Sequence, residues 1–333
     1  MSTIKNPIII EGFWNVGKTS LAKYLQDTHG YLYIPEPNHE NSGIKNNISN
    51  WYTNHHNKRF DQYCNALGND TKVVMERSIL SSAAFDYAQG RNYKSSSFLS
   101  FVNSLNKNIL FVFLYQDLGH INKRKYNISN KKVIRKLRSP SFAKRYDDFF
   151  RTVLPLKWGI VPLFIKQPKT YREGTAKNNC RIIERAIGSN RLGQVNIVCF
   201  YEQKDIKFLL LKRSKEKGGF WQTISGGIKL GEYPKQTALR EIEEEIGVTP
   251  GSEKIIDTSY HYSFIGKEGY ELNEYVFGYK LKDNKIICSA EHVESRFTAK
   301  AEAKKIIKFD TNIKALKYVE NAYRKERAKR PLM

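Results

Sequence analysis

The hydrophobic positions in the first half of the chain come in short runs, separated by stretches with helical spacing. The runs are NPIIIE (6–11), KVVMERS (72–78), NILFVFLY (108–115) and GIVPLFIKQ (159–167). Short buried strands that alternate with helices are typical of a parallel sheet covered by helices on both faces. The last run contains a proline, which we expect at the edge or the end of a strand because it has no N–H to donate.

A closing helix is predicted over KNNCRIIERAIG (177–188), with Gly188 as its C-cap. The pattern then changes. Residues 194–214 indicate two strands joined by a tight polar turn, more strands lie within 255–288, and a last helix runs over about 310–328. This order predicts a mixed α+β domain, so we place the domain boundary directly after the closing helix.

The two predicted domains, residues 1–188 and 189–333, belong to a strongly basic chain. It has 56 Lys and Arg against 33 Asp and Glu, a net charge of +23. That charge favours phosphate-bearing partners, either nucleic acid or small phosphorylated molecules, while a lysine-rich surface that is only solvated is the plain alternative. No apolar run reaches the length of a signal peptide or a membrane span, so we expect a cytoplasmic protein with no membrane partner.

The four cysteines, at positions 64, 180, 199 and 288, are scattered and form no C-x-x-C pair. This spacing argues against a zinc site and against a disulfide framework, and it favours a reducing compartment. We take the Asn- and His-rich stretch 38–58 as a polar loop whose histidines are not metal ligands.

The second domain contains a dense acidic stretch, GGIKLGEYPKQTALREIEEEIGV (226–248). Glu241, Glu244 and Glu245 stand at positions i, i+3 and i+4, so they share one face of a helix. Like charges at this spacing repel each other, and Mg²⁺ prefers such oxygen ligands. Glycines in the preceding loop let its backbone pass close to the helix. The stretch therefore predicts a magnesium site.

This stretch resembles the Nudix box, whose defined positions are filled here by Gly226, Glu232, Arg240, Glu241, Ile242, Glu244, Glu245, Gly247 and Val248. The resemblance implies an α/β/α domain with a mixed sheet that hydrolyses a nucleoside diphosphate linked to another group, using Mg²⁺ or Mn²⁺. It implies that Glu241 and Glu245 are metal ligands and that Glu244 is either a third ligand or the general base. It also implies that Arg240 braces Glu232.

The likeness continues on both sides of the box. FLLLKRS…FWQTISGG (208–227) is similar to the dihydroneopterin triphosphate pyrophosphatases, which also cleave deoxynucleoside triphosphates. EHVESRF (291–297) is similar to a segment in which a glutamate completes the metal site. Glu291 is therefore a candidate fourth carboxylate ligand, and a surface glutamate at the end of a strand is the alternative.

The first domain carries a second phosphate motif, IIIEGFWNVGKTS, between a predicted strand and a predicted helix. Gly12, Gly17, Lys18 and Thr19 fit the pattern G-x-x-x-x-G-K-[ST]. In that context backbone N–H groups and the helix N-terminus hold phosphates, the lysine reaches the β and γ oxygens, and the threonine holds Mg²⁺. The motif therefore predicts an ATP site.

Further segments resemble deoxynucleoside kinases and thymidylate kinases, namely IPEP (34–37), MERSILSSAAFDYAQGR (75–91) and the basic run 121–145. The resemblance implies a P-loop kinase with ATP as phosphate donor. Glu36 would take the proton of a sugar hydroxyl, Glu76 would lie near Mg²⁺, and Arg77 would face the acceptor. The basic run corresponds to a lid over the phosphates. We place Arg124 of this lid at ATP, with Arg135 and Arg138 as alternatives.

Together the segments predict a bifunctional enzyme of nucleotide metabolism. One domain phosphorylates a nucleoside or a nucleoside monophosphate through Lys18, Glu36 and Arg77, and the other is a Nudix pyrophosphohydrolase in which Glu244 acts. Small nucleosides and nucleotides are the expected partners, and a homodimer is left open. The alternative is a Nudix hydrolase of RNA 5′ ends with an RNA-binding or regulatory P-loop domain, which strongly salt-dependent RNA binding would favour.

Overall fold

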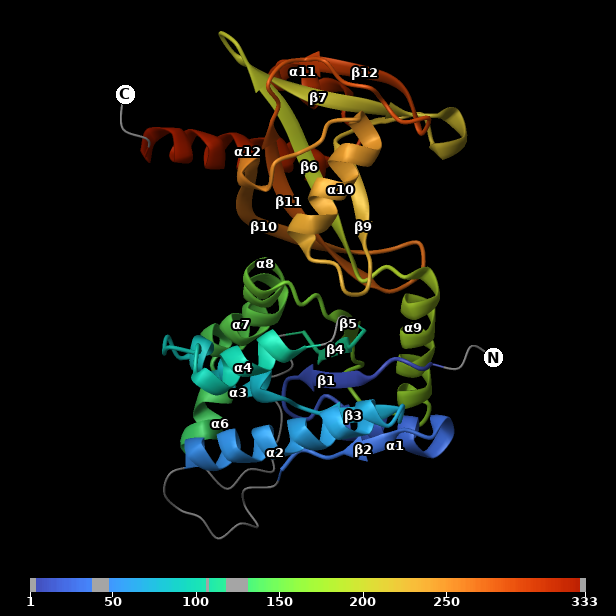
Figure 1. The fold of residues 1–333 in the computed structure, drawn as a ribbon, viewed down its shortest axis with the longest axis vertical. Coiled ribbons are helices and arrows are strands. Elements are labelled where there is room, and N and C mark those ends of the chain that lie inside the picture. Colours follow the sequence, from blue (N-terminus) through green and yellow to red (C-terminus); the bar gives the residue numbers. More distant parts are fainter. Residues whose placement is uncertain (1–3, 38–47, 106–107, 118–130, 330–333) are drawn as a thin grey trace. The chain divides into compact units, whose positions relative to one another are not determined.

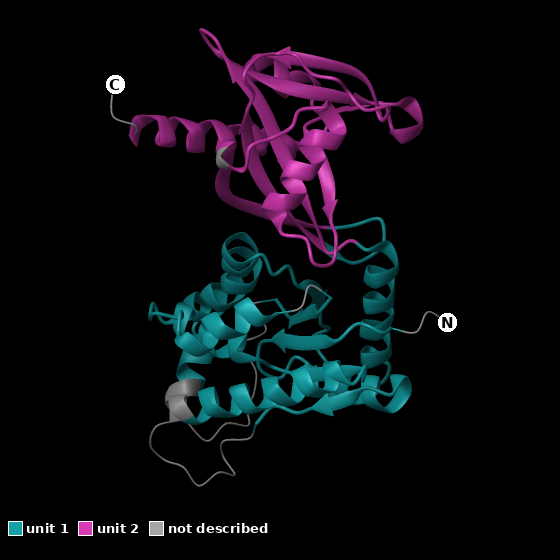
Figure 2. Ribbon diagram, in the orientation of Figure 1, with its two compact units in different colours: residues 1–190, 265–271 teal, residues 191–264, 272–333 magenta. Residues whose placement is uncertain are grey.

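The computed structural model describes residues 4–37, 48–105, 108–117 and 131–329 (Figure 1). The chain divides into two compact units (Figure 2). The first unit comprises residues 1–190 with 265–271, and the second comprises residues 191–264 with 272–333.

A parallel sheet forms the centre of the first unit. Its strands are β1 (Ile8–Gly12), β2 (Leu32–Ile34), β3 (Val73–Glu76), β4 (Leu110–Tyr115) and β5 (Leu163–Lys166). They lie in the order β5-β4-β1-β3-β2, and each neighbouring pair is parallel. The parallel sheet predicted from the short apolar runs is thus confirmed. Pro162 directly precedes β5, so it takes no part in the sheet's hydrogen bonds.

Helices surround this sheet. They are α1 (Lys18–His29), α2 (Ile48–Gly68), α3 (Ile79–Ala88), α4 (Ser96–Ser104), α6 (Lys131–Leu137), α7 (Pro140–Asp148), α8 (Leu154–Trp158) and α9 (Thr175–Ser189). Strands β1 and β3 are buried along their whole length, because the chain covers both faces of the sheet. That arrangement explains why each strand begins with three apolar residues in a row, Ile8–Ile10 and Val73–Met75, rather than alternating.

Helix α2 corrects the expectation of a polar loop over residues 38–58, since residues 48–68 are helical. Its buried residues are His56, Arg59, Tyr63 and Ala66, which follow helical spacing. Two of these four residues, His56 and Arg59, are polar, so the buried face of α2 is not visible in the sequence as a helical repeat of hydrophobic residues.

The C-cap expected at Gly188 is also wrong. Gly188 lies inside α9, and Asn190 takes the left-handed conformation (φ 47°, ψ 46°) that ends the helix. The backbone N–H of Asn190 donates to the carbonyls of Ala186 and Ile187. Asparagine tolerates this conformation better than most residues with a side chain, so it can cap a helix as glycine does.

The second unit is built on a mixed sheet. Its strands are β6 (Gly193–Glu202), β7 (Ile206–Arg213), β8 (Trp221–Gln222), β9 (Ile224–Ile228), β10 (Ile255–Ile265), β11 (Glu271–Lys280) and β12 (His292–Thr298). The central order is β12-β7-β6-β11, with β8, β9 and β10 paired to β7, β6 and β11. Strands β6 and β11 are parallel, and β7 is antiparallel to both β6 and β12. The predicted pair of strands over 194–214 is confirmed.

Helices cover the sheet of the second unit. They are α10 (Pro234–Ile246), α11 (Lys300–Ile306) and α12 (Asp310–Lys329). Helix α12 packs Leu316 and Val319 against a core that includes Val198 and Phe200 of β6. Figure 1 shows α10 lying across β6 and β9, and both strands contact this helix. The acidic helix is therefore held directly on the sheet.

Candidate functional site

Helix α10 presents its glutamates to two different environments. Glu241 and Glu245 are buried, with 7% and 9% of their surface exposed, whereas the Glu244 side chain is 55% exposed. The i, i+4 pair therefore points inward and Glu244 lies at the rim of the same face. Gly247 takes a left-handed conformation and ends the helix directly after the glutamates.

Strand β9, which precedes α10, approaches Glu241 so closely that only glycine fits at position 226. A Cβ atom built on Gly226 would lie 1.8 Å from the carboxyl carbon of Glu241. Gly226 belongs to β9, and β9 is paired with β6. The sheet thus fixes the backbone against the Glu241 carboxylate, as the glycines of the sequence predicted.

Arg240 ties the loop before α10 to the helix. Its Nε lies 2.9 Å from Glu232 Oε1, its Nη1 lies 2.6 Å from Glu241 Oε1, and its Nη2 donates to the carbonyl of Gly227 at 3.1 Å. Its Nη1 also lies 2.9 Å from Glu244 Oε2. Burial alone would raise the pKa of Glu232, but the hydrogen bond from Arg240 and further donors lower it overall. The guanidinium therefore holds ionised carboxylates in fixed positions.

The surroundings of the two buried carboxylates shift their pKa values in opposite directions. Burial raises the pKa of Glu241, and the charges of Glu244 and Glu245 oppose the lowering effect of Arg240. Burial would also raise the pKa of Glu245, yet hydrogen bonds from His292 and Ser289 bring it below its usual range. His292 Nε2 lies 2.6 Å from Glu245 Oε2, and Ser289 Oγ donates to the same oxygen at 2.8 Å.

Glu291 lies in an ion-pair cluster, where the hydrogen bond from Lys217 lowers its pKa and the nearby charge of Glu245 on α10 opposes that effect. Its carboxylate contacts Arg213 Nη2 at 3.1 Å and Lys217 Nζ at 2.7 Å, and its side chain is nearly half exposed. The next residue, His292, contacts Glu245 of the glutamate helix directly. Sequence reasoning missed His292, although it stands beside Glu291 in the quoted segment EHVESRF.

The phosphate motif of the first unit forms a turn between β1 and α1. Gly12 has φ 139°, and a Cβ atom there would lie 2.2 Å from the carbonyl oxygen of Leu114. Gly17 caps α1 with φ 88°. Both backbone conformations are strained for residues with a side chain, so the two glycines of the pattern are needed by the local geometry.

Lys18 and Thr19 begin α1 and are held by polar contacts. Lys18 Nζ donates to the carbonyl of Phe13 at 2.9 Å within the turn, and Thr19 Oγ1 donates to Glu76 Oε1 at 2.8 Å. Burial lowers the pKa of Lys18 to about 8, and the Arg77 charge adds to this effect. The carboxylates of Glu36 and Glu76 act in the opposite direction.

Glu36 and Arg77 form a partly buried ion pair, with Arg77 Nε 2.9 Å from Glu36 Oε2. Arg77 has φ 58°, donates to Ser81 Oγ at 3.0 Å, and lies 4.6 Å above the ring of Trp14. Burial would raise the pKa of Glu36, but the charges of Arg77 and Lys18 lower it overall. Glu36 is therefore ionised and fixed in direction.

Glu11 is a buried carboxylate that sequence reasoning did not single out. It has 1% exposure and accepts hydrogen bonds from Ser78 N and Ser78 Oγ, at 2.8 and 2.6 Å, as well as from Ser81. Burial raises its pKa despite these donors. Its position directly before the phosphate turn was the available signal.

The lid residues are only partly described. Arg124 lies outside the described residues, whereas Arg135 and Arg138 are exposed at the end of α6 and just after it.

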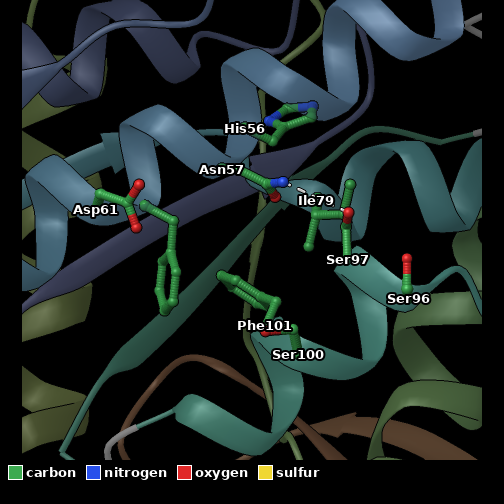
Figure 3. A pocket seen from close by; sticks show the side chains of 9 residues that line it. His56, Asn57, Asp61, Ile79, Ser96, Ser97, Ser100 and Phe101 are labelled. Atoms are coloured by element: carbon green, nitrogen blue, oxygen red, sulfur yellow. Dashed lines mark hydrogen bonds between the residues drawn. The ribbon is translucent and has the colours of Figure 1, made fainter.

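The first unit also contains an open cavity of about 430 Å³ between α2, the start of α3 and α4. Figure 3 shows His56, Asn57 and Phe101 among its lining residues. Burial lowers the pKa of His56 to about 3, so its imidazole is neutral.

No helix within the described ranges is both long and apolar enough to cross a membrane.

Comparison with known proteins gives matches over short parts of the chain. The chain is 40% identical over 60 residues to an octanoyltransferase of Myxococcus xanthus (18% of this chain, 16% of that protein). It is 48% identical over 42 residues to the RNA pyrophosphohydrolase of Psychromonas ingrahamii (13% and 23%). It is 30% identical over 61 residues to the dihydroneopterin triphosphate diphosphatase of Escherichia coli (18% and 41%). The chain therefore spans less than half the length of each of these curated relatives.

A solved structure of the E. coli dihydroneopterin triphosphate pyrophosphohydrolase is 23% identical and has a TM-score of 0.35, covering 38% of this chain and 94% of that one. The model of the NUDIX domain family matches residues 191–317. This stretch contains the mixed sheet, the glycine loop and the glutamate helix described above. The part of this chain that matches the NUDIX domain family is therefore residues 191–317.

Proposed function

We propose that the second unit hydrolyses a nucleoside triphosphate or a related nucleoside diphosphate derivative at a phosphate–phosphate bond. The observation that carries this proposal is the close approach of Gly226 to Glu241, because it fixes a buried carboxylate against the backbone of β9. The basic side chains of Arg213 and Lys217 lie beside Glu291 in the same unit and offer charge to phosphates.

The donor set fits a hard divalent cation. Glu241, Glu244 and Glu245 offer carboxylate oxygens from one helix face, and these are the ligands that Mg²⁺ and Mn²⁺ take in proteins. When bound, such a cation polarises the phosphate oxygens and lowers the pKa of a coordinated water. His292 and Ser289 orient Glu245, and Arg240 orients Glu241, so the ligand directions are set before substrate arrives.

Glu244 is the group that we assign as general base. It is the most exposed of the three carboxylates, and its contact with Arg240 leaves its other oxygen to accept a proton. The attacking water loses its proton to Glu244 while its oxygen bonds to phosphorus. The bond from that phosphorus to the bridging oxygen breaks, and the leaving phosphate carries the electron pair away.

The test is hydrolysis of a panel of nucleoside triphosphates with Mg²⁺, with the products resolved by chromatography. Glu245→Gln should reduce the rate by on the order of 10²-fold or more, because the carboxylate is lost while its size is kept. Glu243→Gln is the matched control, since Glu243 lies on the same helix and is exposed. Hydrolysis by Glu245→Gln at the wild-type rate would overturn the assignment.

We also propose that the first unit is a P-loop kinase that transfers the γ-phosphoryl group of ATP to a nucleoside. The support is the juxtaposition of the phosphate turn, the Thr19–Glu76 contact and the Glu36–Arg77 ion pair. Thr19 and Glu76 would hold Mg²⁺ at the phosphates, and Lys18 would leave the Phe13 carbonyl to meet the β and γ oxygens.

Glu36 is proposed as the base of this transfer. The acceptor hydroxyl oxygen bonds to the γ-phosphorus, its proton moves to Glu36, and the bond to ADP breaks. Arg77 keeps Glu36 ionised and aimed. The cavity lined by His56, Asn57 and Phe101 is our candidate for the acceptor, because it offers both an aromatic ring and an amide.

The acceptor class is tested with nucleosides and nucleoside monophosphates in the presence of ATP and Mg²⁺. If the acceptor is a hydroxyl, Glu36→Gln should slow phosphorylation by on the order of 10²-fold or more. A phosphate acceptor is already anionic and needs little help from a base. Phosphorylation of a monophosphate but of no nucleoside would therefore contradict the proposed role.

Hydrolysis of RNA 5′ ends is the competing reading of the second unit, and one matched relative is named an RNA pyrophosphohydrolase. Polyanion binding weakens steeply with salt, because counterions are released. The rate of hydrolysis is therefore measured at low and at moderate salt, once with 5′-triphosphorylated RNA and once with mononucleotides. A steep fall in the rate with RNA alone would favour RNA as the substrate.

A further inference from the structure

Three side chains of the first unit, far apart in the sequence, converge between two helices. His29 is the last residue of α1, and Cys180 and Glu184 stand on α9. One ligand atom from each of the three lies within 4.8 Å of the other two. His29 Nε2 and Cys180 Sγ are 3.3 Å apart.

We propose that these three side chains bind a transition-metal ion of the zinc class. Thiolate, imidazole and carboxylate are the ligands that Zn²⁺ takes, and the soft thiolate selects against Mg²⁺. Tetrahedral Zn–N and Zn–S bonds place the two ligand atoms roughly 3.5 Å apart, close to the separation of the His29 and Cys180 atoms. Three protein ligands leave the fourth position to water or to an exogenous ligand.

The helices hold the ligands in place. Cys180 and Glu184 are at i and i+4, so they lie on one face of α9. Helices α1 and α9 contact each other in the first unit. His29 ends α1, where the negative end of the helix dipole favours a cation, and Gly30 caps that end in a left-handed conformation. Little rearrangement is therefore needed to close the site.

Burial also suits a metal site. Cys180 is buried, while His29 and Glu184 are each partly exposed. The metal would thus have a shielded sulfur ligand and an open side for entry and for water. Its effect would be to join the helix that follows the phosphate turn to the last helix of the first unit.

The cysteine spacing in the sequence argued against a zinc site, and here the structure points the other way. His29 and Cys180 are 151 positions apart, so no local spacing motif connects them. Only the packing of α1 on α9 brings them together.

The experiment titrates the full-length, chelator-treated protein with Co²⁺ and with Zn²⁺ in a large excess of Mg²⁺, which occupies the carboxylate sites. We expect one equivalent of Co²⁺ to give a thiolate-to-cobalt charge-transfer band, which zinc then removes. At a Zn²⁺ concentration one hundred times Kd, the ratio of folded to unfolded first unit should rise about a hundredfold. A thiol–imidazole hydrogen bond without metal would give neither signal and would overturn the proposal.

The variants assign the ligands. Cys180→Ser should abolish the charge-transfer band, and Cys64→Ser is the matched control because Cys64 is exposed on α2. If Cys180→Ser does not fold, Glu184→Gln and His29→Gln carry the test, and each should weaken metal binding at least tenfold. A band that survives in Cys180→Ser, or that disappears in Cys64→Ser, would contradict the assignment.

Discussion

Glu241 and Glu245 stand one helical turn apart on α10, yet their surroundings move their pKa values in opposite directions. Glu245 is hydrogen-bonded to His292 and Ser289, and it stays ionised. Glu241 lies directly against the backbone of Gly226, and burial there raises the pKa of its carboxyl group. A pair of neighbouring carboxylates with separated pKa values is the usual basis for dividing roles within an active site.

The first prediction concerns Gly226→Ala. The new Cβ would occupy the space of the Glu241 carboxyl group, 1.8 Å away, so the side chain must leave its position. We expect triphosphate hydrolysis to fall by about 10²-fold while the far-UV circular dichroism is unchanged, since a small displacement of a catalytic group has such an effect.

The matched control is Gly188→Ala. Gly188 is exposed within α9 and its Cβ would meet nothing within 4 Å, so alanine should leave hydrolysis unchanged and stabilise the helix by up to about 1 kcal/mol. Full hydrolysis by Gly226→Ala would mean that the position of Glu241 does not matter to the reaction.

The second prediction concerns Glu274, which has 2% exposure and accepts a hydrogen bond from Asn196 Nδ2 at 3.1 Å. Burial raises its pKa from 4.5 to about 7. A raised folded-state pKa stabilises the protein fully below pH 4.5, and this stabilisation is lost as the pH rises through 7. The loss should be on the order of 3 kcal/mol for this single group.

Glu274→Gln removes the titration, because an amide has the shape of the protonated carboxyl group and no charge. The free energy of unfolding should therefore fall less between pH 5 and pH 8 in this variant than in the wild type, as measured by urea denaturation. Glu243→Gln, an exposed change, should follow the wild type. Parallel pH curves for wild type and Glu274→Gln would show that Glu274 is not buried in its protonated form.

At the level of elements, the sequence was most informative where a motif and a periodic pattern agreed. Strand β1, its glycine turn and helix α1 were expected as a unit, and so were the glycine loop and helix α10. Helix α2 was missed, because His56 and Arg59 occupy its buried face. The role of His292 was missed because β12 brings it to α10 through tertiary packing, which spacing along the chain does not record.

The third prediction concerns the connection between the loop and α10. Arg240→Lys keeps the positive charge but cannot contact Glu232, Glu241 and the Gly227 carbonyl together, because a planar fork is replaced by a single ammonium. We expect kcat/KM for hydrolysis to fall about 10- to 100-fold, which is typical of residues that orient metal ligands.

The same measurement on Arg324→Lys provides a control, since Arg324 is exposed on α12 and pairs only locally with Glu320 among the contacts described. An additional readout is the Mg²⁺ concentration needed for half-maximal activity, which should rise in Arg240→Lys alone. Unchanged magnesium dependence would show that Arg240 acts on folding rather than on the ligands.

At the level of the whole molecule, the chain combines a parallel α/β unit with a second unit that contains the match to the NUDIX domain family. The boundary after residue 188 stays a prediction, and residues 265–271 group with the first unit rather than the second. Prediction from the sequence could not anticipate that residues 265–271 group with the first unit, because it assigns each segment to a domain by its order along the chain. Contacts between distant segments decide the grouping instead.

The last prediction is that the two proposed activities are separable. Lys18 interacts with Phe13 and with the charges of Glu36 and Glu76, all in the first unit. Lys18→Ala should therefore lower ATP-dependent phosphorylation by at least about 10²-fold, as the loss of one transition-state donor does, and should leave triphosphate hydrolysis within twofold of wild type. Lys23→Ala, an exposed change on the same helix, is the control for α1.

The reciprocal variant Glu245→Gln should stop hydrolysis and leave phosphorylation unchanged, because the contacts of Glu245 with Ser289 and His292 all lie within the second unit. If either variant abolishes both reactions while the protein remains folded, the two sites are energetically coupled. The protein would then be an allosteric enzyme rather than two independent ones.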